Sequence, residues 1–558
     1  MLTLIGLPVL IGFLASHAPV MAYVPEGTPA LDDESGGQIQ SPSPLDSPVR
    51  KYLDESSEAA ESSLNKAALA RFYSQNGFAP VWTSEQNVES VIRTLADARN
   101  EGLEPLAYRA DLLNERYTAL KDDSSDPDKA AAFDVLLTDA FLRYSTDMRI
   151  GRISPRQGDG AGNWKLEAPS FDAVVYLQQA LQSGNIAQAL ADLPPPHKEY
   201  AALREMLRDF RAQAETTTEW PTVAVNIGKI EPGASNPQIP MLRKRLHLTG
   251  ELAGDVDLES PVMDDVLVEA LKKFQESQGL LVDGVLGKRT IMALNMSPRD
   301  RVRQIIANME RWRWVPRQLE PSRIMINISG QWLELFDNDT EIMSMRVIVG
   351  TRANKTPTLR SKVVSLTLNP HWTLPYSIAS KEVLPKLKKN PNYLAEQEMH
   401  IVGGDIEYPE FIDWSQYGQR NFPYTLRQAS GPRNPLGRIK FNMPNSDDIY
   451  LHDTSNRGMF VRADRALSHG CVRLQKPLDL ALYVLRDQSR WNKEKLEKAI
   501  GTSETQYVNV KTPVPVYLLY WTAWKDANGV AHFRDDIYDR DRTLLAALGK
   551  AVPSVMEN

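Results

Sequence analysis

One thiol and two histidines lie close together near the end of the chain. Cys471, the only cysteine among 558 residues, follows His469 and Gly470 in the stretch RALSHGCVRLQ. A free thiol has a pKa near ~8.5 and becomes a good nucleophile only beside a base or a cation. In extended backbone His469 would share a face with the thiol, because side chains alternate along a strand. His452, earlier in IYLHDTSNRG, is a second candidate base. These residue types suit covalent acyl transfer.

Gly470 adds a conformational argument for the same chemistry. Glycine permits a sharp turn beside the sulfur, and such a turn can aim amide N–H groups at a developing oxyanion. Two other interpretations compete. A lone cysteine is often a small buried apolar residue. One cysteine and two histidines could also bind zinc, but no CxxC or spaced histidine pair supports a metal site. We therefore expect a cysteine nucleophile, with no metal and no cofactor.

Composition restricts the class of protein. The net charge of −7 is modest and spread along the chain, which argues against nucleic acid as the main partner. A hydrophobic content of 42% over 558 residues is enough for several packed domains. A single cysteine provides no disulfide framework, so hydrophobic cores must stabilise these domains without covalent cross-links.

The first 22 residues have the layout of an export signal. Residues 2–15 are almost wholly apolar and small residues follow, although no Lys or Arg precedes the apolar run. The segment predicts export to the periplasm, either with a cleaved signal peptide at 1–22 or with residues 2–22 retained as a tether to the inner membrane. A buried N-terminal helix is the alternative. Residues 23–50 are rich in Pro, Ser, Gly and acidic residues, which predicts a disordered linker.

The elements that must position the thiol belong to a multidomain α+β chain. Residues 51–236 have apolar residues at helical spacing, as in DVLLTDAFLRYSTDMRIGRI, and predict an all-α scaffold. Residues 237–295 predict a small three-helix module, in which Gly279 ends a helix and Asp283-Gly284 forms a turn. From residue 310 to residue 525 the apolar period changes to two, which predicts a mostly antiparallel β domain.

Two further segments interrupt or follow the β domain. Residues 376–433 break the strand pattern with a helical stretch and a long irregular segment rich in aromatic residues. Because loops of this length are uncommon inside compact domains, we expect an inserted cap that folds over the β domain. Residues 526–558 predict a C-terminal hairpin and tail, with the hairpin turn at DANG.

The stretch IYLHDTSNRGMFVRADRALSHGCVRL resembles the signature of the L,D-transpeptidases, YkuD-type cysteine enzymes that cross-link bacterial peptidoglycan. That signature is an early His, a spacer, then Ser/Thr-His-Gly-Cys with Arg close behind. The resemblance implies Cys471 as the nucleophile, His452 as its base, and the main-chain carbonyl of Asp453 as the group that orients His452. It also implies that His469 and the amides of Gly470 and Cys471 shape the oxyanion site. Arg473 would hold the loop or meet a substrate carboxylate, and Ser468 and Tyr450 are also expected to bind the substrate.

The module and the scaffold extend the resemblance. The string FQ–xxx–GL–xx–DG–xx–G–xx–T in the module is similar to a three-helix peptidoglycan-binding module, although an acidic run, GDVDLESPVMDD, replaces its usual short turn. With LARFYSQNGFAPVW and GLEPLAY in the helical part, it resembles the large scaffolded, YcbB-like branch of the family. The resemblance implies peptidoglycan as the partner, with a tetrapeptide stem as donor, a thioester intermediate and an acceptor amine. It also implies acylation of the thiol by carbapenems.

Two other functions stay open from the sequence. One is a different exported cysteine peptidase or transferase, such as a sortase-like enzyme, which would not need a wall-binding module. The other is a non-catalytic peptidoglycan-binding protein whose β domain has lost activity. Replacing Cys471 by Ala separates an enzyme from a binder, because only the enzyme would lose product formation.

Overall fold

The computed structural model describes residues 47–55, 64–123, 125–160, 163–167, 169–217, 219–403, 406 and 408–549. The expected export signal at 1–22 and most of the expected linker at 23–50 lie outside these residues. Helix α1 begins at Pro48, inside the segment expected as linker. Within the described ranges, no helix combines the length and the apolar character that crossing a bilayer requires.

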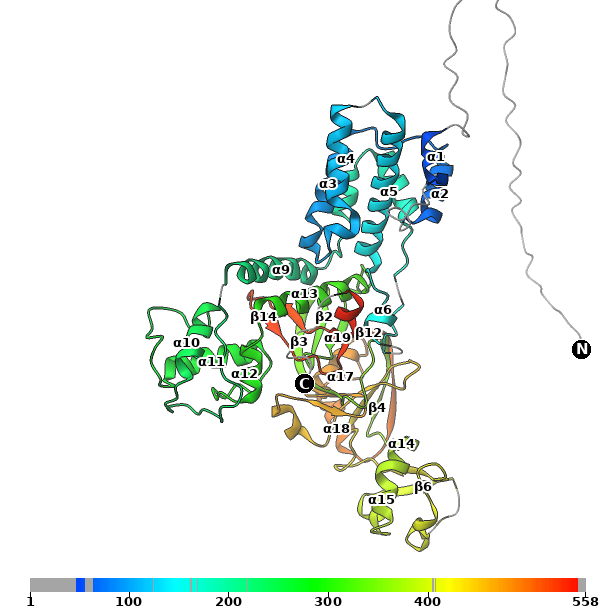
Figure 1. Ribbon diagram of the computed structural model, residues 1–558. Coiled ribbons are helices and arrows are strands. Elements are labelled where there is room, and N and C mark those ends of the chain that lie inside the picture. Colours follow the sequence, from blue (N-terminus) through cyan, green and yellow to red (C-terminus); the bar gives the residue numbers. More distant parts are fainter. Residues whose placement is uncertain are drawn as a thin grey trace, which may run out of the picture.

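Helices form the N-terminal part of the described chain; most of them stack at one end of the molecule, whereas α6 (Pro155–Gly158) and α9 (Lys198–Thr216) lie next to the central β domain (Figure 1). Helix α5 (Pro127–Ile150) lies among the others, and Val135, Leu136 and Ala140, which are predicted at helical spacing, are buried in it. Its N-terminus is capped by the carboxylate of Asp126, which accepts two backbone N–H groups. The other helices of this part are α1 (Pro48–Glu55), α2 (Lys66–Gln75), α3 (Glu85–Ala96), α4 (Ala110–Asp122), α6 (Pro155–Gly158), α7 (Ala173–Ser183), α8 (Ile186–Ala191) and α9 (Lys198–Thr216).

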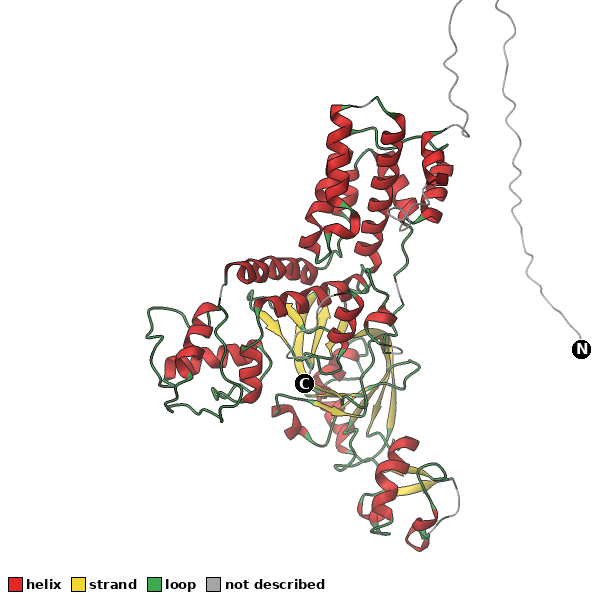
Figure 2. Cartoon of the chain, viewed as in Figure 1, coloured by secondary structure: helices red, strands yellow, loops and turns green. Residues whose placement is uncertain are grey.

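A small module of α10 (Ile239–Leu248), α11 (Asp265–Ser277) and α12 (Lys288–Leu294) lies beside the central sheet (Figure 2). Gly279 follows α11 with a φ of +65°, as expected of a glycine that ends a helix. The buried side chain of Gln275 braces the next turn, because it accepts from the amides of Asp283 and Gly284. Helix α13 (Pro298–Arg313) then connects the module to the sheet.

The central sheet has nine strands in the order β10-β3-β11-β9-β8-β4-β12-β1-β2, and β2 also pairs with β3, so the sheet closes on itself. The pairings β1–β12, β9–β11 and β3–β10 are parallel, and the other pairings of this sheet are antiparallel. The domain is therefore mixed, with antiparallel pairs in the majority. Its strands are β1 (Arg323–Asn327), β2 (Trp332–Asp337), β3 (Thr340–Gly350), β4 (Leu359–Leu368), β8 (Ile439–Asn442), β9 (Leu451–His452), β10 (Ala466–Ser468), β11 (Val472–Leu474) and β12 (Gln506–Leu519).

Every second side chain of these strands points into the closed sheet and fills its interior. Ile324 and Ile326 of β1 point inward with no exposed surface, while their neighbours point outward or to the helices. Asn338 and Asp339 join β2 to β3 with positive φ at both positions, the geometry of a tight hairpin turn that fits the twist of the strands. Helices α17 (Pro477–Val484) and α18 (Lys493–Gly501) add Leu480 and Leu496 to the same core.

The insertion expected as a cap forms a lobe with its own hydrophobic core. Trp414, Phe422 and Leu426 are buried in this core. In Figure 1 the lobe projects from the β domain, whereas the sequence predicted a cap folded over it; the aromatic residues pack on one another instead of on the sheet. The lobe contains β5 (Trp372–Thr373), β6 (Met399–Val402), β7 (Thr425–Gln428), α14 (Tyr376–Ile378), α15 (Leu384–Leu387), α16 (Tyr393–Glu396) and a π-helical turn at Ala379–Val383.

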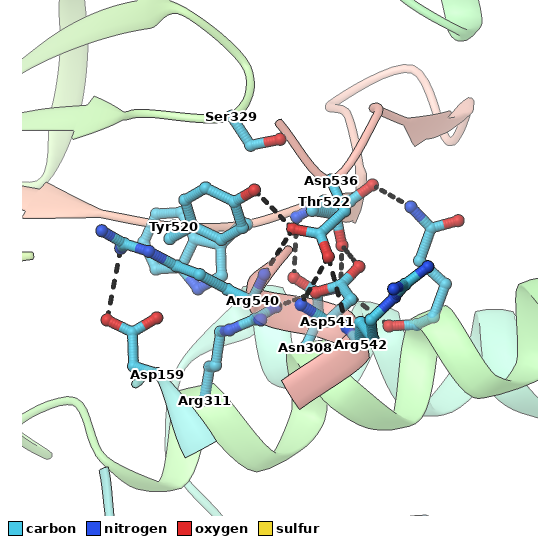
Figure 3. A network of polar contacts seen from close by, with 12 residues as sticks. Asp159, Asn308, Arg311, Ser329, Tyr520, Thr522, Asp536, Arg540, Asp541 and Arg542 are labelled. Carbon is cyan, nitrogen blue, oxygen red and sulfur yellow. Dashed lines mark hydrogen bonds and ion pairs between the residues drawn. The ribbon is translucent and has the colours of Figure 1, made fainter. Parts of the chain in front are cut away.

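The C-terminal segment returns to the helical part and closes a buried polar network (Figure 3). It contains the hairpin β13 (Ala523–Lys525) and β14 (Ala531–Phe533), and then α19 (Arg540–Ala547). Arg311 of α13 bonds Asp541 at 2.5 Å, and Arg540 lies 3.2 Å from Asp159, which follows α6. The hydroxyl of Thr522 also donates to Asp541, at 2.6 Å. These contacts join helices and sheet, and the whole confirms the predicted multidomain α+β fold class.

Candidate active site

Strand register places the predicted site residues on one face of the sheet. Strands β9 and β11 are parallel, with Val472 opposite Leu451 and Arg473 opposite His452. Val472 and Leu451 are buried in the core, so their neighbours along each strand point to the other face. Cys471, directly before Val472, therefore shares a face with His452, as does Tyr450, directly before Leu451.

The thiol of Cys471 rests in a neutral form among polar neighbours. Its Sγ lies 3.8 Å from the carbonyl oxygen of Asp448, to which the S–H donates. Burial raises the pKa of Cys471, and this effect is opposed by hydrogen bonds from Tyr450 and by the positive charges of Lys440 and Arg473. Tyr450, Lys440 and Arg473 therefore offset part of the cost of a buried thiolate, and the raised pKa still favours the thiol.

His452 is 4% exposed and has a fixed ring orientation. Its Nδ1 lies 2.6 Å from the carbonyl oxygen of Asp453. Because a carbonyl only accepts, Nδ1 carries the proton and Nε2 is the basic nitrogen. Burial lowers the pKa of His452 to about 3, helped by the charges of Arg473 and Lys440, so the imidazole is neutral near pH 7. The carboxylate of Asp453 has other partners, the amide of Arg438 and the guanidinium of Arg457.

The turn before the thiol differs from the extended backbone expected there. Gly470 has a φ of +119°, so the chain bends between β10 and β11, and His469 does not continue a strand alongside the sulfur. The hydroxyl of Ser468 donates to the carbonyl of Cys471 at 2.6 Å and accepts from the amide of Gly470 at 3.1 Å. Ser468 thus braces the turn, and its contact with a substrate stays a prediction. The Gly470 amide, expected at the oxyanion site, is already bound to it.

His469 connects the turn to the inserted lobe. Its Nε2 lies 2.6 Å from Oε1 of Glu382, in the π-helical turn of the lobe, and both side chains are about half exposed. Glu382 escaped the sequence analysis because nothing in its local pattern indicates a partner far along the chain. The contact places one lobe residue at the edge of the candidate site.

Lys440 is the second residue that the sequence analysis missed. It lies opposite His452 in the antiparallel β8–β9 pair, and its Nζ stacks over the ring of Tyr450, 4.0 Å from the centroid. The rings of Tyr450 and His452 are 5.6 Å apart. Arg473 completes this face, where its Nη1 lies 3.7 Å from the sulfur of Met459. The alternation in RIKFN could have placed Lys440 on a strand face, but the partner strand could not be predicted.

The side chains on this face are of the types that nucleophilic catalysis uses. They are the thiol of Cys471, the neutral imidazole of His452, and the cations of Lys440 and Arg473, which have no ion-pair partner in the described chain. Within that part of the chain, no group of three His, Cys, Asp or Glu side chains is placed to hold a metal ion. The geometry brings together Cys471, His452, Tyr450 and Arg473 as predicted, and it assigns Ser468 to the turn.

Three segments of the chain match models of known protein families. Residues 321–516 match the family model of an L,D-transpeptidase catalytic domain, residues 67–207 that of a scaffold domain, and residues 235–294 that of a provisionally assigned peptidoglycan-binding domain. A Haemophilus influenzae protein provisionally named an L,D-transpeptidase is 36% identical over 274 residues, which are 48% of this chain and 55% of that protein. The match thus spans about half the length of this relative.

Two solved structures of L,D-transpeptidases are also similar. The protein from Xylanimonas cellulosilytica is 15% identical, with 52% of this chain and 98% of that chain covered and a TM-score of 0.18. The protein from Stackebrandtia nassauensis is 14% identical, with 54% and 96% covered and a TM-score of 0.22.

Proposed function

With an L,D-transpeptidase catalytic domain in residues 321–516, we propose that this protein cross-links peptidoglycan by acyl transfer through a thioester on Cys471. The observation that carries the proposal is the shared face of β9 and β11, where the thiol, the neutral His452 and two cations lie together. The donor is a tetrapeptide stem, and the acceptor is an amine on a neighbouring stem.

The first half-reaction forms the thioester. The proton of Cys471 passes to Nε2 of His452 while the sulfur attacks the carbonyl carbon before the terminal D-residue. The tetrahedral oxyanion then collapses, the C–N bond breaks, and the leaving amine takes the proton from His452. In the second half-reaction the acceptor amine attacks the thioester and gives a proton to His452, which returns it to the departing sulfur. The imidazole is neutral before and after both steps.

Substrate binding explains how a weak base can act. The charges of Arg473 and Lys440 help to hold the pKa of His452 at about 3. A stem carboxylate bound beside these cations would offset their charge, so the pKa of His452 would rise toward the working range. The same cations favour the thiolate, and Tyr450 donates to the sulfur. The bound substrate thus helps to form the nucleophile that attacks it.

The oxyanion site in this proposal uses fewer amides than the sequence predicted. The Gly470 amide is bound to Ser468, so the amide of Cys471 and the ring of His469 are the groups assigned to the developing charge. Glu382, hydrogen-bonded to His469, keeps that ring in place beside the turn.

The location of the substrate indicates where in the cell the protein would act. Peptidoglycan lies outside the cytoplasm, so we place the protein in the periplasm, with residues 1–22 as its export signal or residues 2–22 as its tether to the inner membrane. The thiol would take up a carbapenem, because a strained acyl donor needs the same nucleophile and base.

Product analysis of the purified protein tests this function. The protein is incubated with tetrapeptide-rich wall fragments, and the products are separated and weighed by mass spectrometry. New dimers joined between two diamino-acid residues, with release of the terminal D-residue, support the proposal, and Cys471→Ser should form none. Cleavage of protein substrates would favour an exported peptidase. Sacculus binding that Cys471→Ala leaves intact, with no product from either form, would favour a binding protein.

A further inference from the structure

A groove of about 980 Å³ lies between the three-helix module and the outer face of the closed sheet, away from the residues assigned to catalysis. Its floor follows from strand register. Asn327, Trp332 and Arg346 lie opposite one another across β1, β2 and β3. Leu333, beside Trp332 in the sequence, is buried in the core, so Trp332 points outward.

The walls of the groove come from segments that are far apart in the sequence. The module contributes residues 278–282, the C-terminal hairpin contributes Trp524, and the segment 461–465 closes the other side. That segment leads directly into β10 and the turn that carries Cys471. A ligand in the groove would therefore lie against both the module and the chain segment that enters the candidate active site.

The module is held firmly against the β domain, so the groove is preformed. Arg534 donates to the carbonyl of Ser277 at 2.8 Å, and Arg289 pairs with Asp535 at 2.7 Å. At Gly279, whose φ is +65°, an added Cβ atom would clash with the side chain of Arg534, so the close approach favours glycine. A rigid groove loses little entropy on binding, which favours affinity.

The side chains of the floor combine an apolar platform with polar groups. Trp332 is 36% exposed and presents its ring to the groove. Glu334 lies opposite Ser344 in the next row. Its side chain has no hydrogen bond or ion pair in the described chain, and burial raises its pKa to about 7. Arg346 is exposed and adds a cation to the same floor. A sugar ring matches this set, because its C–H face packs on an aromatic ring while its hydroxyl rim forms hydrogen bonds.

We infer that this groove binds the glycan strand of peptidoglycan, with Trp332 as the stacking platform and Glu334 as a hydrogen-bonding partner. A peptide strand is a poorer fit, because β2 is paired on both sides and offers no free edge for strand addition. The inference rests on the proposed function for the identity of the polymer. It adds a second binding surface that holds the strand while its stem reaches the thiol.

Binding of stem-free glycan to the full chain tests the inference. The probes are chitohexaose and glycan strands from which an amidase has removed the peptides, with the dissociation constant measured by calorimetry. Trp332→Ala should weaken binding at least about ten-fold, in line with the contribution of one aromatic stacking platform. Tyr507→Ala, at an exposed aromatic residue of β12 outside the groove, is the matched control and should bind as the wild type does.

A second variant guards against a folding defect. Leu281→Asp, at an exposed module residue of the groove wall, cannot disturb the sheet and should also weaken binding. Unchanged affinity in both variants overturns the inference, as does binding of stem-bearing fragments only. Because the probes carry no stem, this result is independent of catalysis. Cross-linking activity with unchanged glycan affinity in both variants would reject the groove alone, and glycan binding without cross-linking would reject the proposed function alone.

Discussion

Two groups of buried charges in this protein are partnered in opposite ways. In the C-terminal network, Arg311 and Arg540 each have a carboxylate within ion-pair distance, Asp541 and Asp159 respectively (Figure 3). On the active-site face, Lys440 and Arg473 are partly buried as well, but the described chain supplies no ion pair to either. The first group joins parts of the fold permanently. In the proposed function, the second group keeps its charge available for a substrate carboxylate that is bound only during the reaction.

The comparison separates charged residues that stabilise the fold from charged residues that we propose to act in the reaction. A buried cation that is already paired with a carboxylate contributes little to the binding of an anionic ligand. A buried cation without one disfavours protonation of the neighbouring imidazole and favours the thiolate. Changes in the network should therefore alter stability with little effect on the chemistry, and changes on the active-site face should do the reverse.

The largest effect is expected at the base itself. His452→Gln should slow acylation of Cys471 by a carbapenem about 100–10,000-fold, the scale of losing a positioned general base, as followed by intact mass over time. Asp453→Asn is the matched control, because only its main-chain carbonyl contacts His452, and its acylation rate should be nearly unchanged. Equal losses in the two variants would contradict the assignment of His452 as base.

Breaking the network should cost stability. Asp541→Asn leaves Arg311 buried without its carboxylate, so the free energy of unfolding should fall by about 3–5 kcal/mol in urea titrations. Asp128→Asn removes a carboxylate from an exposed pair with Lys51 and should cause no measurable change. The folded fraction of Asp541→Asn should still be acylated at the wild-type rate. A folded but unreactive variant would show that the two groups of charges are coupled.

The pH dependence of stability offers another test, at Asp147, a partly buried carboxyl that has no ion pair within the described residues. Burial raises the pKa of Asp147 to about 6, and its described hydrogen-bond partner is the Tyr108 hydroxyl. The folded state thus favours the protonated form, and the stabilisation is present below the unfolded pKa near 4 and is lost as pH rises through 6. Between pH 4 and 7 the wild type should lose roughly 2–3 kcal/mol more than Asp147→Asn. Parallel stability curves for the two proteins would refute this.

Removing one unpaired cation should act on the thiol. In Lys440→Met the pKa of Cys471 rises further, because one of the charges that oppose the effect of burial is lost. Alkylation by iodoacetamide at pH 8 should slow about 3–10-fold, and with a single cysteine in the chain every label reports on this site. Lys511→Met, on the exposed side of β12, is the control. Identical pH profiles of alkylation would mean that Lys440 does not act on the sulfur.

The smallest effect is expected at the lobe contact. Glu382 and His469 are about half exposed, and such pairs contribute little free energy. Glu382→Gln should therefore change the rate of acylation by no more than about five-fold. The ratio of cross-linked to hydrolysed product is the more sensitive measurement, since it reports how well the turn excludes water. A loss as large as that of His452→Gln would make Glu382 part of the catalytic machinery.

Much of this site could be predicted from local sequence. The single thiol, the preceding glycine and the early histidine lie within one stretch, and the period-two pattern places His452 near a strand end. What stayed hidden depends on pairing between distant segments. Lys440 reaches the site only because β8 pairs with β9, and Glu382 only because the lobe approaches the turn.

The differences between the expectations and the structure have a common physical cause. The expected oxyanion amide of Gly470 and the expected substrate contact of Ser468 satisfy each other, which residue spacing alone does not reveal. The cap was expected on the sheet because its aromatic residues need burial. They are buried, but in a core that Trp414 and its neighbours form within the insertion. A sequence pattern can predict that an apolar side chain is buried, but it does not identify the residues against which the side chain packs.

The buried network also determines which fragments of this protein could be produced alone. Arg311 and Asp159 receive ion-pair partners from Asp541 and Arg540. A fragment that lacks α19 would leave both side chains in the interior without these partners, which is costly. A truncation designed to isolate the β domain should therefore retain α6, α13 and α19 together.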